Sequence, residues 1–367
     1  MYRAIIQPAL FAMDPENAHD LMRFGARLAN SRIVQPVLHS LYGVQDARLA
    51  VQFAGLSCAN PIGLAAGLDK NAELVGLCAG LGFGHLELGT VTALAQAGNP
   101  KPRIFRLSKD SALINRMGFP SHGADQLAQS LKLIRARFPV LPTIGINIGK
   151  SKLVELDRAI DDYRYSFEQL APYADYVAVN VSSPNTQDLR QLQEKERLQA
   201  LLRALSDVNL YKRPIFVKVA PDLSWAALDE VIECCLESSV AGIIATNTTL
   251  GRAGIVTSID QAGGLSGAPL RARSLEVVRF IGARLGGKLS LIGVGGVATS
   301  EDVLAMLAAG ASMVQLYTAL IYQGPGIVRA LNKGLIAFMD RHACRSLAEA
   351  IDLWNSRNHS PCFQVEG

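Results

Sequence analysis

Residues that can carry charge or hydrogen bonds to a ligand occur at regular points of this sequence, where short apolar runs end. Lys70 and Lys218 lie at two of these ends, and the polar segment 180–185 (Asn-Val-Ser-Ser-Pro-Asn) follows a third. A lysine supplies a positive charge that stabilises an anion, whereas the segment 180–185 is as typical of a plain turn as of a catalytic loop. None of the six histidines lies at such a position. The sequence therefore does not predict a hydrolase triad built on histidine.

A glycine-rich segment at residues 293–297 (Gly-Val-Gly-Gly-Val) lies between an expected strand and an expected helix. Backbone N–H groups exposed at such a turn bind phosphate. The third glycine of a Rossmann dinucleotide motif is missing, and residues 315–317 (Gln-Leu-Tyr) stand where its ribose-binding acid would be. The segment therefore favours a phosphate site after strands seven and eight of a barrel, with Tyr317 and Thr318 as its second half.

The elements that must position these residues are short apolar or β-branched runs separated by helical patterns, which is typical of βα units around a parallel sheet. About eight units indicate the α/β class and a TIM (β/α)8 barrel, whose active site lies at the carboxyl ends of the strands. An alternative explanation is that the strand ends are polar only because loops in general are polar. It does not easily explain why lysines occur at two strand ends and asparagines at several. The expected strands are residues 61–66, 85–90, 143–147, 175–181, 214–219, 242–246, 290–294 and 312–317.

Three regions are expected along the chain. Residues 1–45 form a helical region, because Asp14-Pro15-Glu16 is a typical helix start and apolar residues then recur at helical spacing. Judged by periodicity alone, helices that only pack on the core of the barrel are the better explanation. The barrel takes residues 46–335, and residues 336–367 form a helical or solvated extension.

Two connections, residues 93–119 and 249–270, are longer than ordinary βα loops and predict lids or walls of a site. Residues 303–328 contain no charged side chain and are long enough to cross a bilayer. Gly310 and the segment Gly324-Pro325-Gly326 break this stretch, however, so we expect a helix, a turn, a strand and a loop of a buried core.

Composition excludes several classes of protein. The 367 residues are 49% hydrophobic and 19% charged, with a net charge of +4, so extended disorder is not expected. No basic stripe is present, and we expect no nucleic-acid partner. The six cysteines include no Cys-x-x-Cys pair, so we expect no metal site, no cysteine-ligated iron–sulfur cluster and a reducing, cytoplasmic setting.

Seven motifs occur together in this sequence, at residues 65–70, 115–119, 145–150, 180–185, 245–249, 263–267 and 293–296. Individually several are loose. In this order, and over a stretch from the N-terminal helices to about residue 335, they closely resemble the membrane-associated, quinone-using class of dihydroorotate dehydrogenases. The resemblance implies an FMN-binding barrel that oxidises dihydroorotate to orotate in pyrimidine biosynthesis, with a membrane quinone as the electron acceptor.

The resemblance also implies roles for single residues. Ser183 matches the base, where the soluble class has a cysteine, and would pass its proton to Thr186 or to a water near Phe119. Flavin N5 takes the hydride, and Lys218 matches the lysine beside the flavin N1–C2 carbonyl edge. The implied flavin contacts are Ala66, Gly67, Leu68, Asp69, Lys70, Thr90, Asn147, Asn180, Lys218, Thr246, Gly267, Gly296, Tyr317 and Thr318.

The substrate implied by the resemblance is a flat ring of amide groups with one carboxylate. Asparagine offers both a donor and an acceptor to such edges, and Lys70 suits the carboxylate. Thr90 and Gly267 are also explained as packing or turn residues, and residues 120–122 (Pro-Ser-His) depart from the asparagines of the family. The implied substrate contacts are Lys70, Asn115, Arg116, Met117, Gly118, Phe119, Asn180, Asn185, Asn247 and Thr248.

The partners implied by the resemblance are dihydroorotate and orotate, a membrane quinone and the lipid bilayer, with peripheral attachment at the cytoplasmic face of the cell membrane. Residues 1–45 would deliver the quinone. Two alternatives remain open. The soluble class uses fumarate or NAD, but Ser183, the N-terminal region and the lack of a signal for an iron–sulfur partner subunit argue against it. A phosphate-binding isomerase or non-catalytic barrel would keep residues 293–296 without needing Lys218 or the asparagines.

Overall fold

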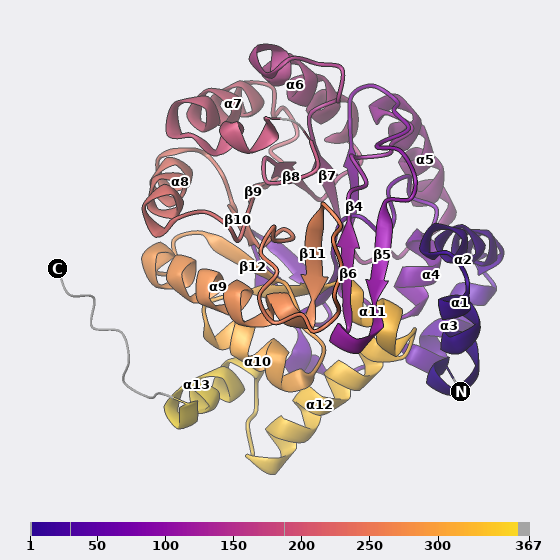
Figure 1. Ribbon diagram of the computed structural model, residues 1–367. Helices are drawn as coiled ribbons and strands as arrows, with labels where there is room; N and C mark the ends of the chain where they lie inside the picture. Colours follow the sequence, from indigo (N-terminus) through magenta and orange to yellow (C-terminus); the bar gives the residue numbers. More distant parts are fainter. Residues whose placement is uncertain (1, 30, 187, 359–367) are drawn as a thin grey trace.

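A computed structural model describes residues 2–29, 31–186 and 188–358. Its centre is a closed barrel of eight parallel strands with helices on the outside, so the predicted TIM barrel is confirmed (Figure 1). Each strand lies within two residues of an expected run. Around the barrel the strands are β3 (Ile62–Leu64), β4 (His85–Val91), β7 (Thr143–Ile148), β8 (Tyr176–Asn180), β9 (Ile215–Val219), β10 (Gly242–Ala245), β12 (Ser290–Val294) and β13 (Met313–Leu316).

The helices that follow the strands cover the barrel with their apolar faces. In α7 (Lys195–Asp207), Leu198, Leu201, Leu202 and Leu205 are buried at the i, i+3, i+4 spacing of an amphipathic helix. The others are α4 (Val75–Gly80), α5 (Ala124–Arg137), α6 (Ala159–Leu170), α8 (Trp225–Glu237), α9 (Arg271–Leu285), α10 (Ser300–Ala308), α11 (Thr318–Gln323) and α12 (Ile327–Arg341).

The amino ends of the strands are closed by a hairpin that the sequence did not predict, β1 (Val51–Phe53) with β2 (Leu56–Cys58). Phe53 packs among the rings of His85, Tyr176 and Phe216, with ring centroids 5.9 to 6.0 Å away. Gly63 makes room for this layer, because a Cβ there would lie 1.9 Å from His85 Cε1. The interior of the barrel is therefore filled by aromatic side chains at this end and left for polar groups at the other.

The two long connections form a three-stranded antiparallel sheet, the lid sheet, made of β5 (Ile104–Leu107), β6 (Ala112–Asn115) and β11 (Gly264–Gly267). β6 pairs with β11 in the register Asn115 with Gly264. Figure 1 shows this sheet in front of the barrel strands. The sequence predicted a lid or wall in both connections but not the strands that join them.

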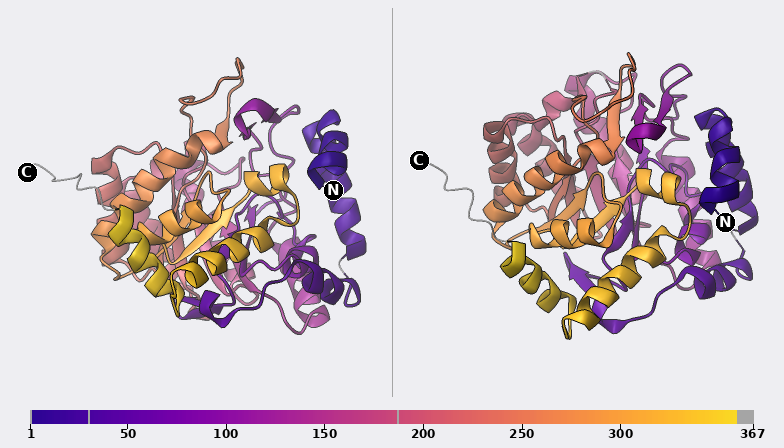
Figure 2. Two further views of the ribbon diagram at one scale, coloured as in Figure 1. Left: turned by 90° about the horizontal axis from the view of Figure 1, so that it is seen from below. Right: turned by 60° about the horizontal axis from the view of Figure 1, so that its bottom comes forward.

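The N-terminal helices lie along one side of the barrel (Figures 1 and 2). They are a π-helical turn (Tyr2–Ile6), α1 (Gln7–Ala12), α2 (Pro15–Ala29) and α3 (Val34–Tyr42), of which the first two were not predicted. Asp14 Oδ1 accepts the N–H groups of Glu16 and Asn17 and so starts α2 as expected. Arg103, just before β5 of the lid sheet, donates to Glu16 of α2 across 2.9 Å, and both residues are buried.

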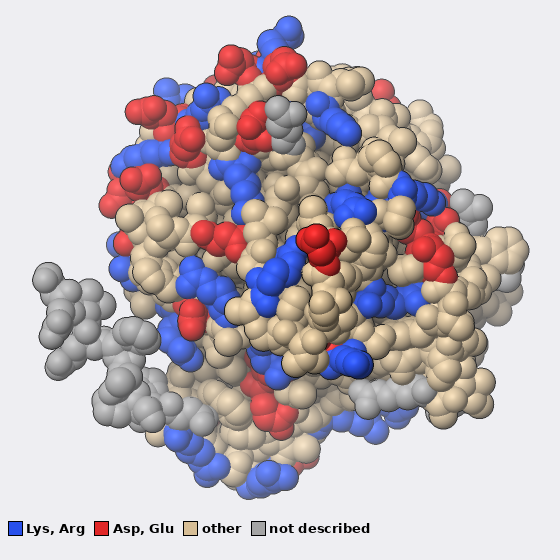
Figure 3. Space-filling view, viewed as in Figure 1, with Lys and Arg blue, Asp and Glu red and all other residues tan. Residues whose placement is uncertain are grey.

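The outer face of these helices carries apolar side chains. Phe24 and Ile33 are 64% and 80% exposed, and Leu21, Met22, Val37 and Leu41 are also exposed. Figure 3 shows mainly uncharged residues along the outer edge of α1 and α2. None of the helices in the described part of the chain is long and apolar enough to cross a membrane.

The last part of the described chain packs against the barrel. Helix α12 continues without a break across residue 335, the expected end of the barrel region. The next helix, α13 (Leu347–Asn358), buries Leu347 and Ala350 and contacts α10. Residues 359–367 of the expected extension lie outside the described residues.

Candidate active site

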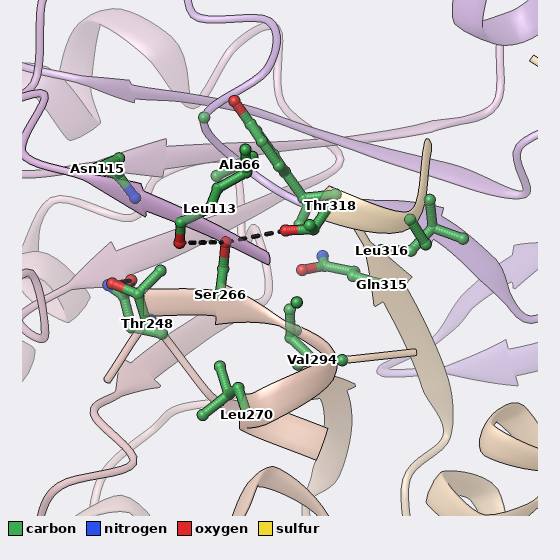
Figure 4. Close-up of a pocket in the computed structure, with 18 of the residues that line it drawn as sticks. Ala66, Leu113, Asn115, Thr248, Ser266, Leu270, Val294, Gln315, Leu316 and Thr318 are labelled. Carbon is green, nitrogen blue, oxygen red and sulfur yellow. Dashed lines mark hydrogen bonds between the residues drawn. The ribbon is translucent and has the colours of Figure 1, made fainter. Parts of the chain in front are cut away.

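A cavity of about 580 Å³ lies at the carboxyl ends of the barrel strands, beneath the lid sheet (Figure 4). Residues from seven of the eight barrel-strand ends, from the lid sheet and from α11 line it. Most of the residues predicted for flavin and substrate meet here although they are far apart in the sequence. Those that line the cavity are Ala66, Gly67, Lys70, Thr90, Asn115, Met117, Gly118, Phe119, Asn180, Ser183, Asn185, Lys218, Thr246, Asn247, Thr248, Gly267, Gly296, Tyr317 and Thr318.

Two of the predicted residues that do not line the main cavity are Leu68 and Asp69. They line a second, smaller cavity between α2 and the barrel. Asp69 accepts the N–H groups of Glu73 and Leu74, each across 2.8 Å, just before α4. Burial raises the pKa of Asp69 to about 6. The carboxylate thus holds the turn that carries Lys70.

Asn147 and Arg116 also lie away from the lining. Asn147 is fully buried behind Thr90, whose hydroxyl donates to Asn147 Oδ1 across 2.5 Å. Arg116 lies over the ring of Phe105, with 4.7 Å from its guanidinium carbon to the ring centroid, and donates to Gln261. Arg116 therefore joins strands of the lid rather than pointing at the cavity.

Asn180, at the end of β8, is the centre of a hydrogen-bond network that fixes its amide. Its Nδ2 donates to Thr90 Oγ1 across 3.0 Å and to Asn147 Oδ1 across 3.1 Å. Its Oδ1 accepts from the hydroxyl of Ser182 and from Asn247 Nδ2, across 3.0 and 3.3 Å. The ends of four barrel strands, β4, β7, β8 and β10, are thereby joined by hydrogen bonds, so the amide edges that face the cavity have defined directions.

Ser183 follows in the same loop and is 5% exposed on the wall of the cavity. Its Oγ accepts the backbone N–H of Asn185 across 3.2 Å. The side chain of Asn185 donates to Asn115 Oδ1 of β6 across 3.4 Å. The loop with the serine is thus connected to the lid sheet, and an N–H group is in place to stabilise negative charge on Oγ.

Lys218, at the end of β9, forms a buried ion pair on the floor of the cavity. Its Nζ lies 2.9 Å from Glu87 Oε1, and the two side chains are 6% and 0% exposed. Burial alone would raise the pKa of Glu87, but the charge of Lys218 and hydrogen bonds from Gln315, Lys218 and Asn147 outweigh it, so the pKa is lowered. Glu87 was not predicted, although a carboxylate inside the apolar run 85–90 was a visible signal.

Lys70 lies where the main and the smaller cavity meet. Its Nζ donates to the carbonyl oxygen of Gly67. Burial, together with the positive charge of Arg103, lowers the pKa of Lys70 to about 8. The side chain is therefore a cation at neutral pH that loses its charge under mildly alkaline conditions.

The glycine-rich turn after β12 closes the other end of the cavity. Gly295 and Gly296 have φ angles of +132° and +71°. A Cβ on Gly296 would lie 2.6 Å from Arg271 Cα, so only glycine fits beside the start of α9. Among the described residues, neither the N–H of Gly295 nor that of Gly296 has a hydrogen-bond acceptor.

The sequence profile of the dihydroorotate dehydrogenases matches residues 48–339 of the chain. The chain belongs to the dihydroorotate dehydrogenase family. Relatives named dihydroorotate dehydrogenase (quinone) match nearly the whole chain. That of Gloeobacter violaceus is 49% identical over 350 residues, covering 95% of this chain and 98% of the relative. That of Chloroflexus aurantiacus is 48% identical over 352 residues, covering 91% and 96%.

Solved structures of this family have the same fold. Crystal structures of dihydroorotate dehydrogenase from Eimeria tenella are 35% identical in sequence to this chain. The complex with ferulenol has a TM-score of 0.84 and covers 92% of this chain and 95% of its own. The ligand-free form has a TM-score of 0.85 and covers 95% and 100%. The membership of the dihydroorotate dehydrogenase family predicted from the seven motifs is confirmed.

Proposed function

We propose that this chain oxidises (S)-dihydroorotate to orotate on bound FMN and passes the electrons to a quinone, a step of pyrimidine biosynthesis. The relatives named above are quinone enzymes of this family. The observation that carries the proposal is that a single cavity brings together Ser183, Lys218 and four asparagines, Asn115, Asn180, Asn185 and Asn247. An isomerase that only bound a phosphate group would need neither the buried Lys218 nor the four asparagines.

The residues of the cavity fit FMN. Its volume of about 580 Å³ is within the usual range for a cofactor pocket. Lys218 offers a positive charge on the floor, and the unpaired N–H groups of Gly295 and Gly296 suit phosphate oxygens. When bound, FMN supplies the hydride acceptor. We propose that Thr90, Thr246, Gly267, Tyr317 and Thr318 complete its contacts, with Asn147 supporting them from behind Thr90.

Dihydroorotate is proposed to lie between the asparagines and Ser183. Asn115, Asn185 and Asn247 present donors and acceptors to the amide edges of the ring, and Lys70 holds the carboxylate. Ser183 accepts the proton from C5 while the N–H of Asn185 stabilises its Oγ. Serine is a weak base at neutral pH, so Ser183 passes the proton on, through Thr186 or a water near Phe119.

The N-terminal helices are proposed to bring the quinone from the lipid phase. Gln7 of α1 is among the residues that line the main cavity, together with Ile104 of β5 and Tyr322 of α11. The exposed apolar face of α2 and α3 suits a peripheral contact with the bilayer, at the cytoplasmic face of the cell membrane. A few hundred Å² of buried apolar surface contributes several kcal/mol at about 25 cal/mol per Å², enough for reversible binding.

The test is an anaerobic half-reaction followed by reoxidation. Purified protein is expected to be yellow, and dihydroorotate is expected to bleach the flavin absorption in the absence of oxygen. A quinone, but neither fumarate nor NAD, is expected to restore it. Colourless protein that takes up no FMN would instead support an isomerase or a binding protein, and reoxidation by fumarate or NAD would support the soluble class.

A further inference from the structure

Glu87 is a fully buried carboxylate in the middle of β4, and side chains from four other barrel strands point at it. Lys218 and Asn147 donate to its Oε1 across 2.9 and 2.8 Å. Gln315 and Tyr176 donate to its Oε2 across 2.7 and 3.2 Å. Each carboxylate oxygen thus accepts two hydrogen bonds and has no lone pair left for a further donor. The four donor side chains are therefore held in place around one negative charge.

This arrangement decides what the floor of the cavity presents to a ligand. Because an ionised carboxylate only accepts hydrogen bonds, Gln315 must turn its NH₂ group toward Glu87. The carbonyl oxygen of Gln315 is buried and has no partner among the described residues, and Gln315 lines the cavity (Figure 4). Lys218 lines the same floor. An unpaired buried acceptor beside a cation indicates a ligand that offers both an N–H donor and an anionic edge.

We propose that Glu87 is a positioning residue that keeps Lys218 charged and in place and, through Lys218, sets the reduction potential of the bound flavin. The proposal rests on the proposed function, since it assumes that the cavity takes a flavin. A cation beside the flavin favours the anionic reduced form. Glu87 does not line the cavity, but two of its hydrogen-bond donors, Lys218 and Gln315, do. Of these two only Lys218 can carry a charge, so the pH-dependent part of the effect must pass through the lysine.

The physical reason is the cost of burying an unpaired charge. Removing one partner of a buried ion pair leaves the other charge uncompensated, and a desolvated ammonium responds by releasing its proton. Two other titratable side chains face Glu87. Burial lowers the pKa of His85 to about 4, and burial and the charge of Glu87 raise that of Tyr176 well above its usual value. Neither changes its charge between about pH 6 and 9. Lys70, which lines the same cavity and whose pKa is lowered to about 8, is present in every variant, so it is the difference between a variant's pH profile and that of wild type that reports Lys218.

The experiment is a spectroelectrochemical titration of the flavin in the holoenzyme over this pH range. It compares wild type, Glu87→Gln, Lys218→Met and the double variant. The potential of Glu87→Gln is expected to approach that of wild type at the acid end and to fall to that of Lys218→Met at the alkaline end. A tenfold loss of preference for the reduced flavin corresponds to about 30 mV for a two-electron couple. In the Lys218→Met background the added Glu87→Gln is expected to change the potential by less than a third of this.

Tyr176→Phe is the matched control. It removes one hydrogen bond from the same carboxylate and leaves the charge, so its pH profile is expected to match wild type. A Glu87→Gln profile parallel to wild type over the whole range would overturn the proposal, as would an equal shift in the Lys218→Met background. The flavin absorption of the wild-type protein and its bleaching by dihydroorotate are measured first. A failure of the proposed function is thereby distinguished from a failure of the proposal for Glu87.

A second measurement covers the case in which Glu87→Gln does not retain FMN. NMR of the lysine side chains is then recorded on the flavin-free chain at about pH 8 for wild type and Glu87→Gln. A neutral amine at Lys218 in the variant, with an ammonium in wild type, supports the proposal. An ammonium in both overturns it.

Discussion

The hydroxyl group of Ser266 lies 2.9 Å from that of Thr318, so one hydroxyl pair joins the lid sheet to the first turn of α11 (Figure 4). Ser266 Oγ also lies 3.4 Å from the carbonyl oxygen of Leu113 on β6. Thr318 comes two residues after the end of the last barrel strand. The lid and the mouth of the barrel are thus connected at the wall where the flavin is proposed to bind.

Ser266→Ala and Thr318→Val are each expected to weaken FMN binding about fivefold, because each removes a hydrogen bond worth roughly 1 kcal/mol. The two effects are expected not to add, since both variants break the same pair. FMN dissociation constants of the two single variants and the double variant check this. Ser130→Ala, which removes an exposed hydroxyl on α5, is the control, and fully additive effects would contradict the connection.

Ser183→Ala is expected to keep FMN but to slow flavin reduction by dihydroorotate by about 10²–10⁴, the usual effect of losing a general base. Ser183→Cys is expected to retain more activity than alanine, because it restores a titratable group. Anaerobic stopped-flow measurement of flavin bleaching gives both rates. Ser182→Ala removes the neighbouring hydroxyl and should have a smaller effect. Near-normal reduction in Ser183→Ala would place the base elsewhere.

Binding of orotate is expected to weaken as the pH rises through about 8. The folded-state pKa of Lys70 is lowered to about 8, so its positive charge is present below this pH and lost above it. The affinity is measured from the change in the flavin spectrum between about pH 7 and 9. In Lys70→Gln binding should be weaker and free of this pH dependence, whereas Lys152→Gln, an exposed lysine, should behave as wild type. The same pH profile in Lys70→Gln would disprove the assignment.

The free energy of unfolding is expected to fall as the pH is lowered from about 6.5 toward 4. Burial lowers the pKa of His85 from 6.5 to about 4, so in this window the unfolded chain binds more protons than the folded one. The lost stability is about 2 kcal/mol between pH 7 and 5 for this one group. Urea unfolding at the two pH values should show a loss about 2 kcal/mol larger in wild type than in His85→Gln. His19, whose pKa burial likewise lowers to about 4, contributes equally to both proteins.

The control for this measurement is His122→Gln, which replaces an exposed histidine and is expected to keep the loss seen in wild type. Asp69 works in the opposite direction, because burial raises its pKa to about 6. Its contribution is the same in every variant and cancels in the comparison. An equal loss in wild type and His85→Gln would show that acid acts elsewhere in the chain.

Leu21→Glu combined with Phe24→Glu is expected to reduce liposome binding about 10²-fold, since each side chain contributes roughly 1.5–3 kcal/mol when buried. Both are exposed on α2, so the fold should be unaffected. Turnover with a long-chain quinone should fall accordingly, while bleaching by dihydroorotate continues. Leu210→Glu changes a leucine that is 84% exposed and lies outside the N-terminal helices, and it is the control. If the double variant bound liposomes as wild type does, the N-terminal helices would only cover the barrel and would not contact the membrane.

The sequence alone was sufficient for the barrel and the family. Each barrel strand is an apolar or β-branched run that ends in glycine or a polar residue, and such runs can be recognised locally because their neighbours along the chain define them. Ser183 and Lys218 were found in this way at the ends of β8 and β9. The start of α2 at Asp14 was equally local, since its side chain accepts the N–H groups of Glu16 and Asn17, two and three residues further on.

The tertiary structure decided which distant residues meet. The lid sheet pairs Asn115 with Gly264, and Glu87 receives hydrogen bonds from four other strands, although local periodicity around each of these residues predicts neither contact. The spacing of apolar residues indicates the conformation of a single segment. These contacts, by contrast, form only when the barrel closes and brings the inward-facing side chains of different strands together. The sequence therefore determined the strands and their polar ends, and only closure of the barrel placed the buried carboxylate of Glu87 beneath Lys218.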